Sequence, residues 1–135
     1  MTPEAARQDW RDRLDTLEEA YEFFLAYAAQ GRRDEPANQP VRSFLAKAEA
    51  ALDGLVYTAR KLITSELLGP SDAQHAFVDV LEQDATKALA AIRLVQAQQP
   101  IGSQLVDNLN ASIHLRALLT DLFLIDETLD SRGDD

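Results

Sequence analysis

Two histidines are the side chains in this sequence best suited to metal binding or phosphoryl transfer, because the chain contains no cysteine. Di-iron and di-manganese helical bundles place a histidine three residues after a glutamate. Neither His75 nor His114 has that neighbour. His75 has Asp72 at this spacing, but both belong to the first turn of a predicted helix, where acidic residues are favoured and exposed. We therefore predict no metal site and no cofactor.

His114 stands in the segment SIHLRAL, where Arg116 follows two residues later and a small residue comes next. A histidine that exchanges a phosphoryl group needs neighbours of these kinds, but the segment does not contain the His-x-Leu-Lys-Gly pattern typical of histidine phosphotransfer domains. On a helical wheel His114 aligns with Asp107, Asn110 and Asp121, which favours a solvent-exposed polar stripe. A histidine phosphotransfer module therefore remains only a further alternative.

A second polar row on the same predicted helix is formed by Asn108, Ser112 and Arg116, which are four residues apart. If this helix is buried on two sides, the row becomes a buried polar seam that fixes helix register, or it lines a small pocket together with His114. These four residues are our pocket candidates. They define the alternative function, a bundle that binds a small ligand or a metal.

Nucleophilic catalysis finds no support in the sequence. None of the serines stands in a recognisable nucleophile elbow, and the chain contains no glycine-rich phosphate loop and no dinucleotide-binding fingerprint. We predict that the protein is not an enzyme and that it has no catalytic residues.

The composition limits the possible partners. With a net charge of −10 over 135 residues, the chain repels nucleic-acid phosphates and anionic lipids, so neither nucleic acid nor membrane is an expected partner. The polar start, MTPEAARQDW, does not resemble a signal peptide, and no apolar stretch approaches the roughly 20 residues that span a bilayer. We expect a cytoplasmic protein with a single domain over residues 1–135.

Apolar periodicity predicts an all-α fold. Trp10, Leu14, Leu17, Tyr21, Phe24 and Ala28 recur at alternating spacings of four and three, which places them on one helical face. Proline, glycine and polar residues divide the chain into predicted helices at about 3–30, 40–68, 72–99 and 103–129, with a loop at 31–40 and a frayed tail at 130–135. Short connections between long helices predict an antiparallel up-down-up-down four-helix bundle.

Apolar surface beyond the needs of one core provides the functional hypothesis. Phe23 and Tyr27 lie outside the six-residue face of the first helix, and the second half of the last helix is apolar over most of its circumference. We predict a non-enzymatic interaction, adaptor or accessory protein that forms a homodimer or binds a protein partner. The interface candidates are Phe23, Tyr27, Leu118, Leu122, Phe123 and Ile125.

Overall fold

The computed structural model describes residues 1–33, 40–66 and 72–133, and over these ranges it contains six helices and no strand. Their bounds are α1 Pro3–Ala28, α2 Pro40–Leu52, α3 Leu55–Glu66, α4 Asp72–Gln96, α5 Ser103–Ala111 and α6 Ile113–Gly133. The prediction of an all-helical fold is confirmed, but the chain forms six helices where we predicted four. Most of the predicted loop, the predicted end of the second helix and the last two residues of the predicted tail lie outside the described ranges.

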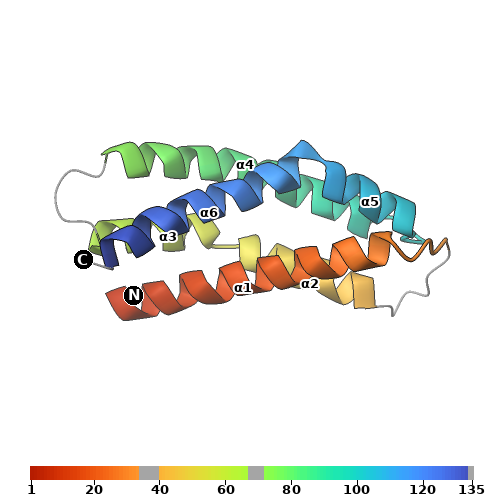
Figure 1. Ribbon diagram of the computed structural model, residues 1–135, viewed down its shortest axis with the longest axis horizontal. Coiled ribbons are helices and arrows are strands. Elements are labelled where there is room, and N and C mark those ends of the chain that lie inside the picture. The colour runs from red at the N-terminus through yellow and green to blue at the C-terminus, as the bar shows by residue number, and fades with distance from the viewer. Residues whose placement is uncertain (34–39, 67–71, 134–135) are drawn as a thin grey trace.

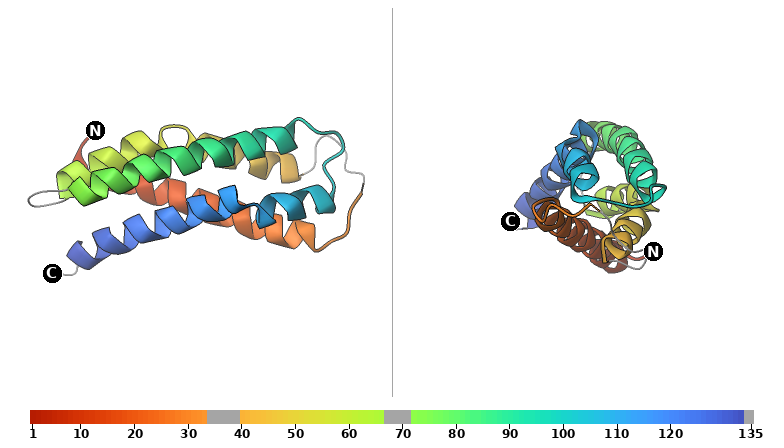
Figure 2. Two further views of the ribbon diagram at one scale, coloured as in Figure 1. Left: turned by 90° about the horizontal axis from the view of Figure 1, so that it is seen from above. Right: turned by 90° about the vertical axis from the view of Figure 1, so that its right-hand side faces the viewer.

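The helices form an elongated molecule in which the chain runs back and forth along the long axis (Figure 1). Helices α2 and α3 follow each other end to end, as do α5 and α6, and both pairs run opposite to α1 and α4 (Figures 1 and 2). Helix α1 packs against α2, α3 and α5, whereas α4 packs most extensively against α6. The two chain ends lie at the same end of the molecule (Figure 1).

The first helix begins and packs largely as its sequence predicts. The hydroxyl of Thr2 accepts a hydrogen bond from the amide of Ala5 at 3.0 Å, so Thr2 caps the helix in front of Pro3. Trp10 and Phe24 are buried in the core, and the Trp10 indole donates to Asp126 Oδ1 of α6 at 3.0 Å.

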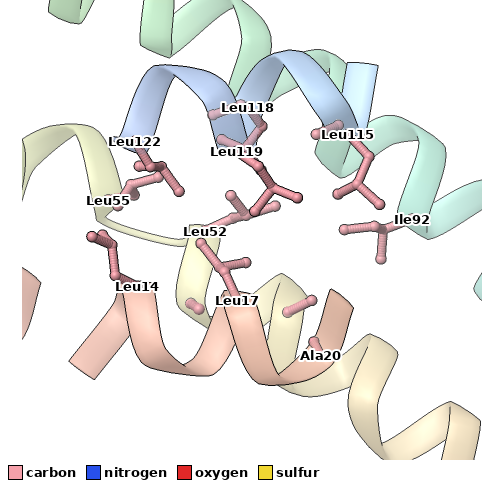
Figure 3. Close-up of a cluster of buried hydrophobic side chains, with 14 of the residues drawn as sticks. Leu14, Leu17, Ala20, Leu52, Leu55, Ile92, Leu115, Leu118, Leu119 and Leu122 are labelled. Atoms are coloured by element: carbon pink, nitrogen blue, oxygen red, sulfur yellow. The ribbon is translucent and has the colours of Figure 1, made fainter. Parts of the chain in front are cut away.

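The core lies between all the helices. Figure 3 shows leucines of α1, α2, α3 and α6 converging on one another. A helix surrounded in this way buries a wider stripe than a single seam requires. The buried side chains of α1 accordingly include Ala20 and Tyr27 in addition to four of the six residues on the predicted face, while Tyr21 and Ala28 are partly buried.

The second predicted helix is interrupted at Gly54, which separates α2 from α3 and adopts a φ of +84°. This left-handed conformation costs glycine little, because glycine has no Cβ to clash with the backbone. From the sequence, Gly54 is expected inside a continuous helix, where it either weakens the helix or allows another backbone to come close. Its actual role is to let the chain turn between two shorter helices.

Arg13 of α1 stabilises this interruption. Its Nη1 donates to the carbonyl of Ala51 at 2.9 Å and also to the carbonyl of Asp53, two acceptors that the end of α2 leaves without a helical partner. Asp9 holds the guanidinium in place, because its Oδ2 accepts from Arg13 Nε at 2.7 Å and from the Thr58 hydroxyl at 2.6 Å. These bonds and the Arg13 charge outweigh the effect of burial and lower the pKa of Asp9.

The last predicted helix is interrupted at Ser112. This residue has a ψ of 140°, which ends α5. Its hydroxyl accepts from the amide of Leu115 at 3.4 Å, so the same residue caps the start of α6. Because the chain leaves the helical path here, positions on α5 and α6 no longer share one helical wheel.

One end of the molecule, where α1 finishes and α5 begins, is closed by hydrogen bonds. The Tyr27 hydroxyl donates to the carbonyl of Ile101 at 2.5 Å, and the Ser103 hydroxyl donates to the carbonyl of Tyr27 at 2.7 Å. Ser103 and Arg32 exchange two more bonds of 2.8 Å each through their amides. We call these four residues and their bonds the hydrogen-bonded end.

Candidate functional site

The structure divides the six interface candidates between core and surface. Tyr27 is 4% exposed, so the expectation that it lies outside the core is wrong: its ring packs inward and its hydroxyl belongs to the hydrogen-bonded end. Leu118, Leu122 and Ile125 are also buried, because α6 faces both α4 and α1. These four residues are at most 4% exposed, although Ile125 lines the pocket described below. Whether the chain associates with itself stays a prediction.

The two remaining interface candidates have different surroundings. Phe23 is partly buried and stacks on Phe44 of α2 with ring centroids 4.2 Å apart, so much of its surface is already used within the chain. Phe123 is exposed on α6, next to the exposed Leu124. The apolar excess predicted for the last helix therefore reduces to a small outward-facing part of α6.

The structure leaves three of the four pocket candidates on the surface. Asn108, His114 and Arg116 are exposed and Ser112 is partly buried. Ser112 acts on the backbone, since it ends one helix and caps the next. The pocket described below is lined by other residues.

The polar stripe predicted around His114 is also divided. Asp107 and His114 are exposed, whereas Asn110 and Asp121 are buried. Each helix carries one exposed and one buried member of this stripe, Asp107 and Asn110 in α5 and His114 and Asp121 in α6. The interruption at Ser112 separates the two pairs, so the four residues do not form one continuous stripe. Neither side-chain oxygen nor nitrogen of Asn110 has a hydrogen-bond partner within the described part of the chain.

An apolar pocket lies at the end of the molecule opposite the hydrogen-bonded end, between α3, the start of α4 and the end of α6 (Figure 1, left). Its volume is about 260 Å³. We call it the apolar pocket, and its lining residues are Ile63, Ala73, Gln74, Phe77, Leu124, Ile125 and Thr128. We call the part of the molecule that contains it the open end.

The lining of the apolar pocket suits an apolar guest. Leu124 is 52% exposed and Phe77 is partly buried, so a bound group would cover apolar surface that now faces water. Of the two polar residues, Thr128 donates its hydroxyl to the carbonyl of Ile125 at 2.7 Å within its own helix. The lining contains no ionisable side chain, which makes the pocket suited to binding rather than to acid–base chemistry.

Asp121 is a buried acidic residue of α6 that faces α4. Its side chain is 6% exposed, and its Oδ2 has no hydrogen-bond partner among the residues that the structure describes. Burial, together with a hydrogen bond to the Asp84 carboxyl and the charge of Asp84, raises the pKa of Asp121 to about 7. A hydrogen bond between two carboxyls requires one of them to carry a proton. Below about pH 7 the pair therefore keeps a proton that an isolated aspartate, with a pKa of 3.8, has already released.

Metal binding and membrane insertion find no support in the described ranges. No three His, Asp or Glu side chains there converge on a point where a metal ion would bind. None of the helices described is both long and apolar enough to cross a lipid bilayer.

No protein-family model matches this chain, and no curated protein or solved structure matches it either.

Sequence reasoning named Ile125 but missed Phe77 and Leu124, two other residues that line the apolar pocket. Phe77 directly precedes the buried Val78, and Leu124 lies within the long apolar run of the last helix, so neither stands out. Asp121 left a clearer signal, since it interrupts that apolar run at a position between Leu118 and Ile125. A charged residue on the buried stripe of a helix is rare unless it is paired, and this would have singled it out.

Proposed function

We propose that this chain is a non-enzymatic interaction module whose apolar pocket receives an apolar side chain of a protein partner. The observation that supports it best is the pocket itself, which is nearly all apolar, open to solvent and free of ionisable groups. We further propose that the fold is an antiparallel four-helix bundle in which two of the four helices are interrupted, at Gly54 and at Ser112.

The size of the pocket supports a protein side chain as its guest. A volume of about 260 Å³ lies just below the range of roughly 300 to 1,000 Å³ that is usual for pockets holding drug-sized ligands. A single large apolar side chain is a better match. Covering one leucine or phenylalanine in this way contributes about 1.5 to 3 kcal/mol, and anchors of this kind dominate the affinity of many interfaces.

Charge supports a basic partner over a second copy of this chain. The net charge is −10, and the exposed Asp72 and Glu127 directly adjoin two lining residues, Ala73 and Thr128. A second copy would bring another −10 to the same surface, whereas a basic amphipathic helix brings the complementary charge. We therefore propose a basic, amphipathic helical segment of another protein as the occupant.

A model peptide tests this proposal. A fluorescent peptide of leucine and lysine, about five turns long with all its leucines on one helical face, is titrated with the protein and followed by anisotropy. Leu124→Gln is expected to weaken binding at least about tenfold, because it removes an apolar wall of the pocket. The matched control is Ile113→Gln, on the same helix, at a residue that is 73% exposed and outside the pocket.

Two outcomes would count against the proposal. Equal losses in Leu124→Gln and Ile113→Gln would mean that the peptide adheres to the acidic surface in general. Light scattering of the protein without peptide tests self-association: a dimer that dissociates in Leu124→Gln would make a second copy the occupant of the apolar pocket and would contradict the argument from charge.

A further inference from the structure

We infer that the binding site continues from the apolar pocket along the seam between α4 and α6 to Asp121 and Asp84, and that the partner presents a lysine or arginine one helical turn from its apolar anchor. This inference rests on the proposed function of the apolar pocket. It adds the chemistry of the partner's second contact.

Helical spacing places Asp121 beside the pocket. Leu124 and Ile125 follow it by three and four residues, and Thr128 follows by seven, so these four side chains occupy one stripe of α6. The pocket thus begins one turn, or about 5.4 Å, beyond Asp121. On α4, Asp84 lies two turns beyond the lining residue Phe77 on the same face, and the two helices are antiparallel (Figure 1). Asp84 on α4 and Asp121 on α6 therefore lie next to the pocket, toward the middle of the two helices that form its sides.

The described residues leave this carboxyl pair without a cation. On α4 the titratable group facing Asp121 is Asp84, and the Lys87 one turn further along is exposed. Within α6 the neighbours one turn away are the uncharged Ala117, Leu118, Leu124 and Ile125. Charged groups of the other helices have other neighbours. Glu18 of α1 lies near Asp126, and Arg60 of α3 pairs with Asp79 of α4. Asp107 of α5 is exposed at the opposite end of the molecule.

An incoming cation would remove an existing cost. The hydrogen bond between Asp121 and Asp84 exists only while the pair holds a proton, and a buried carboxylate that ionises without a cation loses its hydration and gains nothing in return. A lysine or arginine reaching Asp121 would restore a hydrogen-bonded ion pair in a site shielded from water, where the attraction exceeds that of an exposed pair. The same cation would compensate the repulsion between Asp121 and Asp84 when both are ionised.

Two small probes separate the cationic contact from the apolar one. Octylammonium chloride and 1-octanol share an alkyl chain but differ in charge, and octylammonium stays cationic between pH 5.5 and 8. Each is titrated into the ¹⁵N-labelled protein at both pH values. We expect octylammonium to bind at least about tenfold more tightly at pH 8 than at pH 5.5, since it needs an ionised carboxylate. Octanol should bind with the same affinity at both pH values.

Variants assign this effect to named residues. Asp121→Asn keeps the shape of the side chain and removes its charge, so it should abolish the pH dependence of octylammonium binding and leave octanol binding unchanged. Asp84→Asn is the second arm, because Asp84 is only partly buried, and it should reduce the same pH dependence. Each variant is first checked for native helix content by circular dichroism.

The possible failures are distinguishable. If both probes bind the wild-type protein with affinities that do not depend on pH, the cationic contact is overturned while the apolar pocket stands. If neither probe shifts the amides of the pocket residues, the proposed function fails, and this inference fails with it. The wild-type titrations decide between these results even if a variant does not fold.

Discussion

The two ends of this molecule handle their polar groups in opposite ways. At the hydrogen-bonded end, the Tyr27 and Ser103 hydroxyls and the backbone of Arg32 and Ile101 bond to one another, and each of these contacts joins segments far apart in the sequence. At the open end, an apolar pocket faces solvent and the Asp121 carboxyl lies buried beside it without a cation.

This contrast separates buried polar groups that stabilise the fold from a buried polar group that we connect with binding. Most buried polar groups in proteins are paired, as those of the hydrogen-bonded end are, and pairing of this kind is sufficient to explain their presence. Asp121 and Asp84 share a hydrogen bond only while one of them holds a proton, and without a cation the buried Asp121 lowers stability when it ionises. Its position next to the apolar pocket is the reason to connect it with binding.

The largest expected effect comes from comparing two phenylalanines, one toward each end. Phe24 is fully buried, so Phe24→Ala should lower the free energy of unfolding by about 3 to 5 kcal/mol. Phe77 is only partly buried, and Phe77→Ala should cost no more than about 1.5 kcal/mol. Urea denaturation measures both. Equal losses would mean that the open end is packed as tightly as the core, which would contradict the contrast between the ends.

The next effect is a pH dependence of stability that originates at the open end. The pKa of Asp121 is about 7 in the folded chain, against 3.8 for an ordinary aspartate, so between these two pH values the folded chain keeps a proton that the unfolded chain has released. The stability contributed by this group is complete below about pH 4 and is lost as the pH rises through about 7. The loss amounts to about 2 to 4 kcal/mol.

Asp121→Asn isolates this contribution from those of other titrating groups. The variant should be more stable than the wild type at pH 8, and the advantage should disappear toward pH 4. Urea denaturation at intervals across this range gives the comparison. If the two curves of stability against pH run parallel, Asp121 does not titrate in the folded chain near neutral pH, which would contradict a raised pKa for Asp121 at the open end.

At the hydrogen-bonded end, Ser103→Ala tests whether pairing is what closes the structure. The substitution removes the Ser103 hydroxyl from the Arg32 amide and from the Tyr27 carbonyl, which still accepts from the Gln30 amide at 3.1 Å, and the loss of these two bonds should cost about 1 to 3 kcal/mol. Gln104→Ala is the matched control, because Gln104 is exposed on the next position of the same helix. Peptide binding at the open end should be unchanged in both variants, and a loss in Ser103→Ala alone would mean that the two ends are coupled.

The smallest effect concerns the two glycines with positive φ. Gly54→Ala combines a strained conformation with a contact of 3.1 Å between the new Cβ and Arg13 Nη2, whereas Gly31→Ala meets nothing within 4 Å. We expect a loss of about 1 to 2 kcal/mol for Gly54→Ala and a smaller one for Gly31→Ala. Thermal unfolding compares them. Equal losses would show that the Arg13 contact adds nothing to the backbone strain.

Periodicity alone predicted most of the helical segments, because an apolar stripe at helical spacing is a local property of the sequence. It did not predict that Tyr27 is buried, since the width of the buried stripe on α1 depends on how many helices surround it. It also grouped His114 with Asn110 and Asp121 on one face. Ser112 ends the shared helix between Asn110 and His114, and on α6 itself His114 is exposed whereas Asp121 is buried. The open end brings together α3, α4 and α6, and no local pattern reveals which faces of distant helices meet.

The most direct test of the central claim is to map the binding of the leucine–lysine peptide by NMR on the ¹⁵N-labelled protein. We predict that the amides whose chemical shifts change cluster around Phe77 on α4 and between Asp121 and Thr128 on α6. The chemical shifts of the amides around Ser103 should not change. Perturbations centred on the hydrogen-bonded end, or spread evenly along the exposed acidic residues of α1, would contradict the assignment of binding to the open end. These acidic residues are Asp12, Asp15, Glu19 and Glu22.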